Sequence, residues 1–233
     1  MNERHRNKRL TAMRYVLGLP RSVWYNFRLL PLSQARHLPL LISHRTRVVD
    51  VSGKINLCAD KLRIGLVKIG FNTCQITDFR YHRTTLNIRG RLDLLGECAI
   101  GAGSSVEVSE TGTLTLGDHF NMGPRSLVIC NHRITFGREV LTSWQCTFMD
   151  TDQHQLVDCE GHCSNEDRPI VFGDNVWCGC NVIVTKGTRV CSHVTIGAGS
   201  CVHGVFDEEQ TVIAGNPARV VRHGVRRKLD SEN

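Results

Sequence analysis

Residues 170–202 read IVFGDNVWCGCNVIVTKGTRVCSHVTIGAGSCV, and their apolar side chains recur with a period of six. One set of positions, spaced by this period, is apolar throughout: Phe172, Cys178, Val184, Val190, Ile196 and Val202. A second set, at the fifth place of each hexad, is small or β-branched: Val176, Val182, Thr188, Val194 and Ser200. An α-helix would repeat near 3.6 residues and a flat strand near 2, so this period indicates short strands joined by turns.

This pattern is typical of a hexapeptide β-helix, in which each strand with its turn forms one side of a coil. Successive coils would lie about 4.8 Å apart, so the first set of side chains would stack in a column inside the coil. The second set would point inward near a corner, where only small side chains fit. We therefore predict an all-β fold, a parallel β-helix over residues 46–205, with a polar loop at 155–169 that leaves one coil.

The same residues resemble the left-handed β-helix acyltransferases. Within these, the sequence is similar to bacterial O-acetyltransferases of the maltose and galactoside type that modify sugars of surface polysaccharides. NVWCGCNVIVTKG (175–187), VTIGAGSCV (194–202) and AGNPARVVR (214–222) resemble the closing coils and tail of that family. ITFGREVLTSWQCTFMDTDQH (134–154) resembles the segment that carries its catalytic histidine. The left-handed coil is implied by this resemblance, because spacing alone does not set the hand.

The flanking segments do not follow the hexads. Residues 1–45 predict a basic, partly helical cap, with Ser22 as the N-cap of a short helix that ends at Pro31. Such a cap would cover the open first coil, and a contact with the inner face of a membrane is the alternative. Residues 48–94 alternate without a clean six and predict irregular first coils or, alternatively, a flat β-sheet appendage. Residues 206–233 predict a turn and a basic tail.

The charge and cysteine content narrow the possible partners and the compartment. A net charge of +7 favours an anionic partner, while 6% aromatic residues and the lack of a nucleic-acid module argue against nucleic acid. The sequence contains no apolar run of about 18 residues, so it predicts no membrane-spanning helix, and it indicates no signal peptide. Eleven scattered cysteines, with Cys146 and Cys178 at inward positions, indicate reduced thiols and a cytoplasmic protein, with the inner membrane face as an alternative location.

Two metal-site hypotheses are weak. Cys159, His162 and Cys163 form a candidate zinc cluster, but no second pair follows at zinc-site spacing. A related branch of the resembled fold binds zinc through three histidines, and His119 and His132 do not have its spacing. We therefore expect no metal.

His154 is the leading catalytic candidate, because it ends a repeat just before the polar loop. An imidazole can remove the proton of an attacking hydroxyl at neutral pH, and a thioester donor requires no covalent enzyme intermediate. The resemblance implies this role for His154. Asp152 is a candidate to orient the imidazole or polarise the acceptor, and Asp150 is a candidate acceptor contact that could instead stabilise a turn. Trp144 and Trp177 lie on outward phases and are further acceptor-binding candidates.

The resemblance also implies a site for acetyl-CoA along the closing coils. The matching positions are Cys180, Ala198, Gly199, Arg219 and Arg222. The two arginines suit the phosphates, since a guanidinium forms two parallel hydrogen bonds to such oxygens. Where relatives often carry Thr-Lys after the last coil, this chain has His203 and Gly204, which removes one cationic contact.

Together these features predict an acetyl-CoA-dependent O-acetyltransferase that acts on a sugar hydroxyl of a surface polysaccharide or its precursor. The resemblance implies a homotrimer with sites between subunits. An N-acetyltransferase acting on an amino-sugar nucleotide and a non-catalytic β-helix scaffold are the alternatives.

Overall fold

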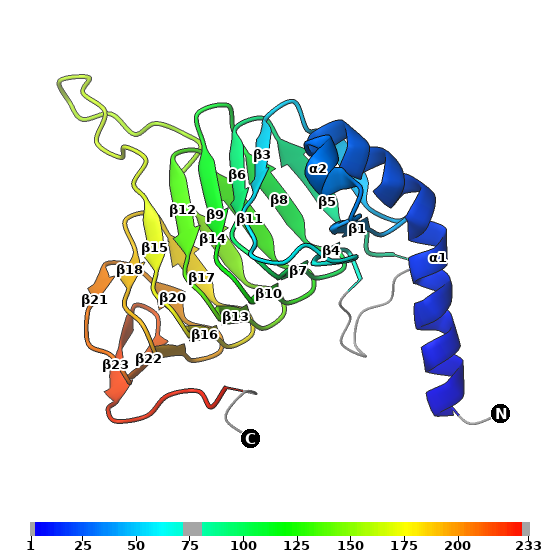
Figure 1. The fold of residues 1–233 in the computed structure, drawn as a ribbon. Coiled ribbons are helices and arrows are strands. Elements are labelled where there is room, and N and C mark those ends of the chain that lie inside the picture. Colours follow the sequence, from blue (N-terminus) through cyan, green and yellow to red (C-terminus); the bar gives the residue numbers. More distant parts are fainter. Residues whose placement is uncertain (1–2, 72–80, 230–233) are drawn as a thin grey trace.

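The computed structural model describes residues 3–71 and 81–229, and in these residues the strands wind into a three-sided coil (Figure 1). Sheet A contains β1 (Leu40–Ile42), β4 (Val67–Ile69), β7 (Cys98–Ile100), β10 (Phe120–Met122), β13 (Leu141–Thr142), β16 (Trp177–Cys178), β19 (Thr195–Ile196), β22 (Val212–Gly215) and β23 (Ala218–Arg222). Sheet B contains β2 (Arg47–Asp50), β5 (Thr85–Ile88), β8 (Ser105–Val108), β11 (Leu127–Cys130), β14 (Thr147–Met149), β17 (Ile183–Thr185) and β20 (Cys201–Val202). Sheet C contains β3 (Lys54–Leu57), β6 (Arg91–Leu94), β9 (Thr113–Leu116), β12 (Arg133–Phe136), β15 (Ile170–Phe172), β18 (Arg189–Val190) and β21 (Val205–Phe206).

The sixfold period closes one coil for every three hexads. Trp177 pairs in parallel with Thr195, and Ile183 with Cys201, so partners in the closing coils are separated by three complete hexads. All the inward positions quoted from residues 170–202 are buried. Among the described strand pairs, β22 and β23 alone run antiparallel. The predicted parallel β-helix is confirmed.

The first coils are longer than three hexads, which explains why their sequence shows no clean six. Ser105 pairs with Leu127, and Thr113 pairs with Arg133, and both intervals exceed three hexads. β8 and β9 have four residues each and bury two alternate side chains. The segment from residue 48 to 94 joins the same three sheets, so it forms the first coils and not a flat appendage.

Phenylalanine rings from all three sheets fill the middle of the coil. The ring of Phe136 lies 4.8 Å from that of Phe120, 5.1 Å from Phe148 and 5.4 Å from Phe172, measured between centroids. Smaller side chains fill inward positions beside these rings and beyond them, including Cys146 and Cys178, which are fully buried as predicted. Burial raises the pKa of the Cys146 thiol to about 11, so this group stays protonated and acts as a small apolar side chain.

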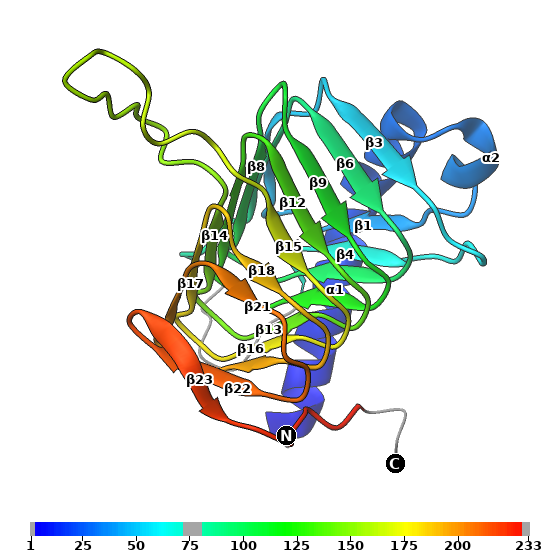
Figure 2. The same ribbon diagram turned by 90° about the vertical axis from the view of Figure 1, so that its left-hand side faces the viewer.

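The turns between the sheets stack into three edges, which we name after the sheets that they join. The AB edge includes residues 143–146, 179–182 and 197–200, and the BC edge includes 131–132, 150–169 and 186–188. The turn at 150–169 is much longer than its neighbours. It leaves the BC edge between β14 and β15 and projects away from the coil (Figures 1 and 2).

The N-terminal helix is longer than the sequence predicted. α1 (Glu3–Leu29) lies beside the first coil and is followed by α2 (Leu32–Ala35) (Figure 1). Pro20 lies inside α1, and its missing N–H would have bonded to the carbonyl of Val16, whose side chain is exposed. Water can bond to such a carbonyl instead, so the helix tolerates the loss of this one hydrogen bond. None of the helices in the described residues is both long and apolar enough to span a bilayer.

Ser22 is therefore not an N-cap, and with Asn26 it joins α1 to the free edge of sheet A. Ser22 Oγ accepts a hydrogen bond from the N–H of Ile42 at 2.8 Å. The amide of Asn26 donates to the carbonyl of Leu40 at 2.7 Å and accepts from its N–H at 3.0 Å. These bonds satisfy edge groups of β1 that have no further strand to pair with, which is how a cap protects the end of a solenoid.

Candidate active site

Asp150 begins the long turn of the BC edge, and its side chain is completely buried. Its carboxylate accepts hydrogen bonds from the backbone N–H groups of Asn131 at 2.7 Å and His132 at 2.9 Å. Both donors belong to the turn of the preceding coil, so Asp150 joins two successive turns. The predicted role of Asp150 as an acceptor contact does not agree with this placement, and the alternative of turn stabilisation describes it.

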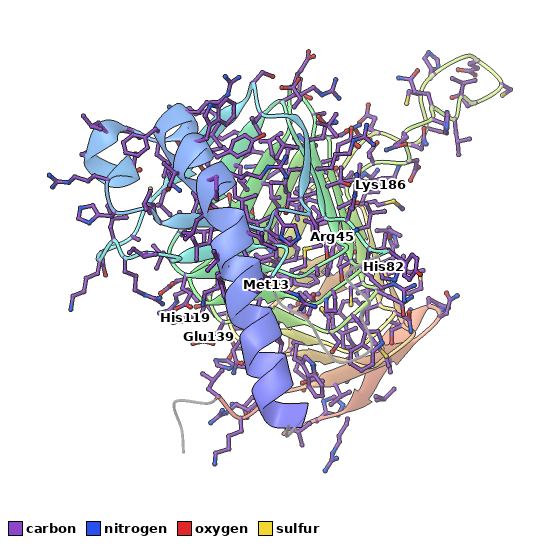
Figure 3. All side chains as sticks on the ribbon, turned by 90° about the vertical axis from the view of Figure 1, so that its right-hand side faces the viewer. Met13, Arg45, His82, His119, Glu139 and Lys186 are labelled. Carbon is purple, nitrogen blue, oxygen red and sulfur yellow. The ribbon has the colours of Figure 1, made fainter. Side chains whose placement is uncertain are left out.

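Three side chains hold the neck of the loop together, and we call Asp152, Asn165 and Lys186 the neck clamp. Asp152 Oδ2 accepts hydrogen bonds from Lys186 Nζ at 2.6 Å and from Asn165 Nδ2 at 2.7 Å. Lys186 Nζ also donates to the backbone carbonyl of Asn165 at 2.6 Å. Lys186 is labelled in Figure 3. Its side chain is only 15% exposed, so its charge requires these partners.

The clamp depends on the ionised form of Asp152. Hydrogen bonds from Lys186 and then from Asn165 lower the pKa of the Asp152 carboxyl. A carboxyl whose pKa is lower in the folded state stabilises that state above its unfolded pKa. This contribution is lost as the pH falls through the folded pKa. The clamp is therefore intact at neutral pH and is released only under acid conditions.

His154 lies immediately beyond the clamp and is held through its backbone. Its carbonyl accepts a hydrogen bond from Asn165 Nδ2 at 2.9 Å, the same amide that contacts Asp152. The His154 side chain is exposed, and no described side chain forms a hydrogen bond to its imidazole. The sequence suggested that Asp152 orients the imidazole directly. In this structure Asp152 does not contact the imidazole, and it is linked to the His154 backbone through Asn165.

A polar cavity of about 410 Å³ opens beside His154. It is lined by Asn131, Thr151, Gln153, His154, Gln155, Cys163, Asn165, Glu166 and Asp167. A polar cavity of this size can hold a hydroxyl-bearing molecule, and an accessible imidazole beside it can remove the hydroxyl proton. Sequence reasoning missed Asn165 and Lys186 here. Lys186 was the one charged residue among the turn positions 186–188 of the quoted stretch, and that was the available signal.

The predicted donor-site residues lie on another edge of the coil. Cys180, Ala198 and Gly199 follow one another up the AB edge, where the N–H of Gly199 donates to the carbonyl of Cys180 at 2.8 Å. Ala198 and Gly199 are exposed, and Cys180 is half-buried. The antiparallel strand β23 continues sheet A beyond them and carries Arg219 and Arg222, both exposed. The structure thus brings all five residues to one end of the AB edge and sheet A.

The two tryptophans belong with the AB edge and not with His154. The N–H of Asn181 donates to the carbonyl of Trp144 at 3.1 Å, so Trp144 lies one coil before Cys180 on this edge. Trp177 is in sheet A, and its Nε1 lies 3.4 Å from Ser143 Oγ. Both residues are 37% exposed. Sheet B, roughly 10 to 15 Å wide, separates them from the BC edge of their own chain.

The described residues contain no group of three or more His, Cys, Asp or Glu side chains arranged to hold a metal ion. Cys159, His162 and Cys163 lie near the tip of the loop, and all three are exposed. Asp158 holds this tip by accepting a hydrogen bond from the N–H of His162 at 2.9 Å. The three residues therefore form part of a hydrogen-bonded turn.

The sequence is similar to several known proteins, although no family model matches it. An uncharacterised 24.8 kDa protein from the cps region of Klebsiella pneumoniae is 31% identical over 60% of this chain and 62% of its own length. WbbJ of Escherichia coli, named for lipopolysaccharide biosynthesis O-acetyl transfer, is 25% identical over 73% of this chain and 88% of its own length. The galactoside O-acetyltransferase of Escherichia coli is 27% identical over 50% and 57%.

The coverage of these relatives is uneven. The chain matches less than two thirds of the Klebsiella protein and of the galactoside acetyltransferase, but most of WbbJ. Among solved structures, the polySia-specific acetyltransferase NeuO superposes with a TM-score of 0.62 over 81% of this chain and 90% of that chain. Its sequence is 18% identical, so this match supports the fold alone.

Proposed function

We propose that this chain, a member of the hexapeptide-repeat sugar O-acetyltransferases, transfers an acetyl group from acetyl-CoA to a sugar hydroxyl of a surface polysaccharide or its precursor. The observation that carries this proposal is the exposed imidazole of His154, held by its backbone at the mouth of a polar cavity. The similarity to WbbJ, over most of that protein, supports the glycan as the acceptor class.

In the proposed reaction the sugar hydroxyl binds in the cavity and gives its proton to His154 as its oxygen attacks the thioester carbonyl carbon. The carbon–sulfur bond then breaks, and the departing coenzyme A thiolate takes up a proton from the imidazolium. An ester of the sugar and free coenzyme A result, and His154 returns to its neutral form. No covalent enzyme intermediate is needed, because a thioester is already reactive towards a hydroxyl.

The exposed residues of the AB edge support the donor part of this proposal. The exposed backbone around Ala198 and Gly199 leaves room for an extended pantetheine chain, and Arg219 and Arg222 offer cations beyond it. Acetyl-CoA is abundant in the cytoplasm, and we place the reaction there.

The site is completed by a second copy in this proposal. His154 is on the BC edge and the donor residues are on the AB edge, so one chain presents two half-sites on different sides of sheet B. A ring of copies in which the BC edge of one faces the AB edge of the next would join them. We propose a homotrimer for this reason, with Trp144 and Trp177 of one copy lining the acceptor cavity of its neighbour.

The reaction is tested by incubating the full chain with acetyl-CoA and oligosaccharides from surface glycans. We expect a mass increase of one acetyl group, released by mild alkali as an ester would be. An alkali-stable product would instead indicate an amide on an amino sugar. If acetyl-CoA neither binds nor reacts with any glycan, the chain is a scaffold and the proposal is wrong.

A large side chain at the proposed donor site should block the enzyme. Ala198→Trp places a large ring on the exposed AB edge, and we expect turnover at low acetyl-CoA to fall roughly 10²-fold, because donor binding is lost. Isothermal titration should then detect no binding of acetyl-CoA. Val205→Trp is the matched control, an exposed residue on sheet C that should leave donor affinity unchanged. Equal affinity in the two variants would remove the AB edge from the donor site.

The neck clamp should act on turnover without acting on the donor. Lys186→Met leaves Asp152 without its cation and loosens the segment that carries His154, so we expect kcat to fall roughly 10- to 100-fold. The KM for acetyl-CoA should stay constant, because the donor lies on another edge. Lys186→Arg should recover part of the loss, and Lys54→Met, at an exposed lysine of β3, is the control. A parallel loss in both Met variants would mean that the clamp has no special role.

A further inference from the structure

The N-terminal helix α1 has apolar side chains on both of its faces. Surface helices usually turn their apolar face towards the protein and a polar face towards water. The inner face of α1 packs Tyr25 and Leu29 against the core and bonds to β1 through the buried Ser22 and Asn26. The opposite face exposes apolar side chains whose exposed fractions range from 40% to 63%: Met13, Val16, Leu17, Leu19, Val23, Trp24 and Phe27. We call these seven residues the outer stripe.

The outer stripe is continuous and uncovered. Met13, Val16, Leu17, Trp24 and Phe27 follow the three-and-four spacing that places side chains along one side of a helix. Figure 3 looks directly onto α1, which lies in front of the coils with no other described element over it. An apolar stripe of this length on the surface marks a site of interaction.

Positive charge accompanies the stripe. Arg14, Arg21 and Arg28 recur at every seventh position and follow one flank of it, and the Arg28 guanidinium lies 5.1 Å from the centre of the Trp24 ring. Residues 1–36 contain eight Lys or Arg and one Glu, which equals the formal net charge of +7 of the whole chain. The remaining residues hold 21 Lys or Arg and 21 Asp or Glu. The charge excess of the chain is therefore confined to this segment.

The electrostatic environment of His44 agrees with this excess of positive charge. His44 lies where Arg21 donates hydrogen bonds to the carbonyls of His44 and Thr46. Partial burial, and then the charges of Arg45, Arg14 and Arg21, lower the pKa of His44. The part of α1 that lies beside His44 is thus a region of positive potential.

We propose that α1 binds the surface of an anionic lipid bilayer, with the outer stripe in the headgroup and acyl boundary and the basic residues against the lipid phosphates. A helix with an apolar stripe, a basic flank and a tryptophan at the border has the composition of interfacial membrane helices. An acidic polymer would match the arginines but would leave the apolar stripe in water. A second copy placed symmetrically against the same face would bring like charges together.

The geometry assigns an orientation to the docked protein. α1 lies at the first coil, and the loop that carries His154 leaves the fifth coil, between β14 and β15. Four coil steps of about 4.8 Å place the candidate active site roughly 20 Å further from the membrane than the first coil. If the proposed function holds, this position suits a glycan attached to a lipid, whose sugars extend from the bilayer.

The proposal is tested by flotation of the full chain with vesicles of phosphatidylcholine alone or with roughly one third phosphatidylglycerol. We expect flotation with the anionic vesicles only, and weaker flotation at high salt. Val16→Gln combined with Phe27→Gln should weaken binding at least roughly tenfold, because the apolar contact is lost. Val205→Gln is the matched control, since Val205 and Val16 are both 63% exposed.

Several outcomes would overturn this proposal. They are absence of binding by the parent chain, equal binding to both kinds of vesicle, and unchanged binding by the stripe variant. If the stripe variant lowers the molecular mass in solution, the stripe is an interface between copies. Flotation requires no acetyl-CoA, so this test is independent of the proposed reaction, and the stripe variant should retain turnover on a soluble oligosaccharide.

Discussion

Replacing His154 with alanine should lower kcat by roughly 10² to 10⁴, because no other group in the described cavity is placed as a neutral base towards the acceptor. The cavity also contains Glu166 and Asp167, but carboxylates are weaker bases than imidazole at neutral pH. The KM for acetyl-CoA should change little, since the proposed donor edge is elsewhere. Steady-state kinetics with a soluble acceptor, at saturating acetyl-CoA, measures both values.

His162→Ala is the control for this variant. His162 is an exposed histidine of the same loop, and its imidazole lies 3.5 Å from the Asp158 carboxylate instead of at the cavity. We expect its turnover to stay within twofold of the parent chain, and both variants should keep the parent molecular mass. Turnover of His154→Ala within twofold of the parent would remove His154 from the mechanism.

The closing coils could be predicted residue by residue, because there one coil equals three hexads. Each inward position in 170–202 repeats at a fixed interval, so its neighbour in the next coil is found by counting. The early coils could be predicted only as strands. Their longer strands add a second inward residue and change the coil length, so Ser105 meets Leu127 at an interval that no sixfold count provides.

The N-terminal helix shows where local signals were outweighed. Ser22 is a residue that typically begins a helix, and the sequence prediction treated it as an N-cap. In the structure α1 begins well before Ser22 and continues through Pro20, and Ser22 and Asn26 form hydrogen bonds with β1. These partners lie well beyond the next turn of the helix, and local propensity does not report contacts at such a separation.

The candidate site was predicted in its principal residue but not in its support. The position of His154 before a polar loop was visible in the sequence. The clamp was not, because Asn165 and Lys186 are brought to Asp152 by the path of the loop and by the next coil. Asp150 and Asp152 were both site candidates, and the turn between them buries the first and exposes the second. In the proposed homotrimer the donor residues reach this site from a second copy, and the sequence of one chain does not contain that geometry.

Two inactive variants should restore activity when they share one oligomer. His154→Ala removes the base and keeps the donor edge, whereas Ala198→Trp fills the donor edge and keeps the base. In a trimer that contains both chains, whichever is in the majority, one of the three junctions joins an intact BC edge to an intact AB edge. Recovery therefore requires that the two half-sites come from different chains.

The measurement is the turnover of mixed oligomers, made by co-expressing the two variants with different tags and purifying them over both. If two copies build each site, the mixed trimer should regain about one third of the parent turnover at low acetyl-CoA. Alone, His154→Ala should stay roughly 10²- to 10⁴-fold below the parent, and Ala198→Trp roughly 10²-fold below it. If a single chain holds the whole site, no junction is repaired and the mixture stays as inactive as its components. That result, or a parent chain that is monomeric in solution, would contradict the account.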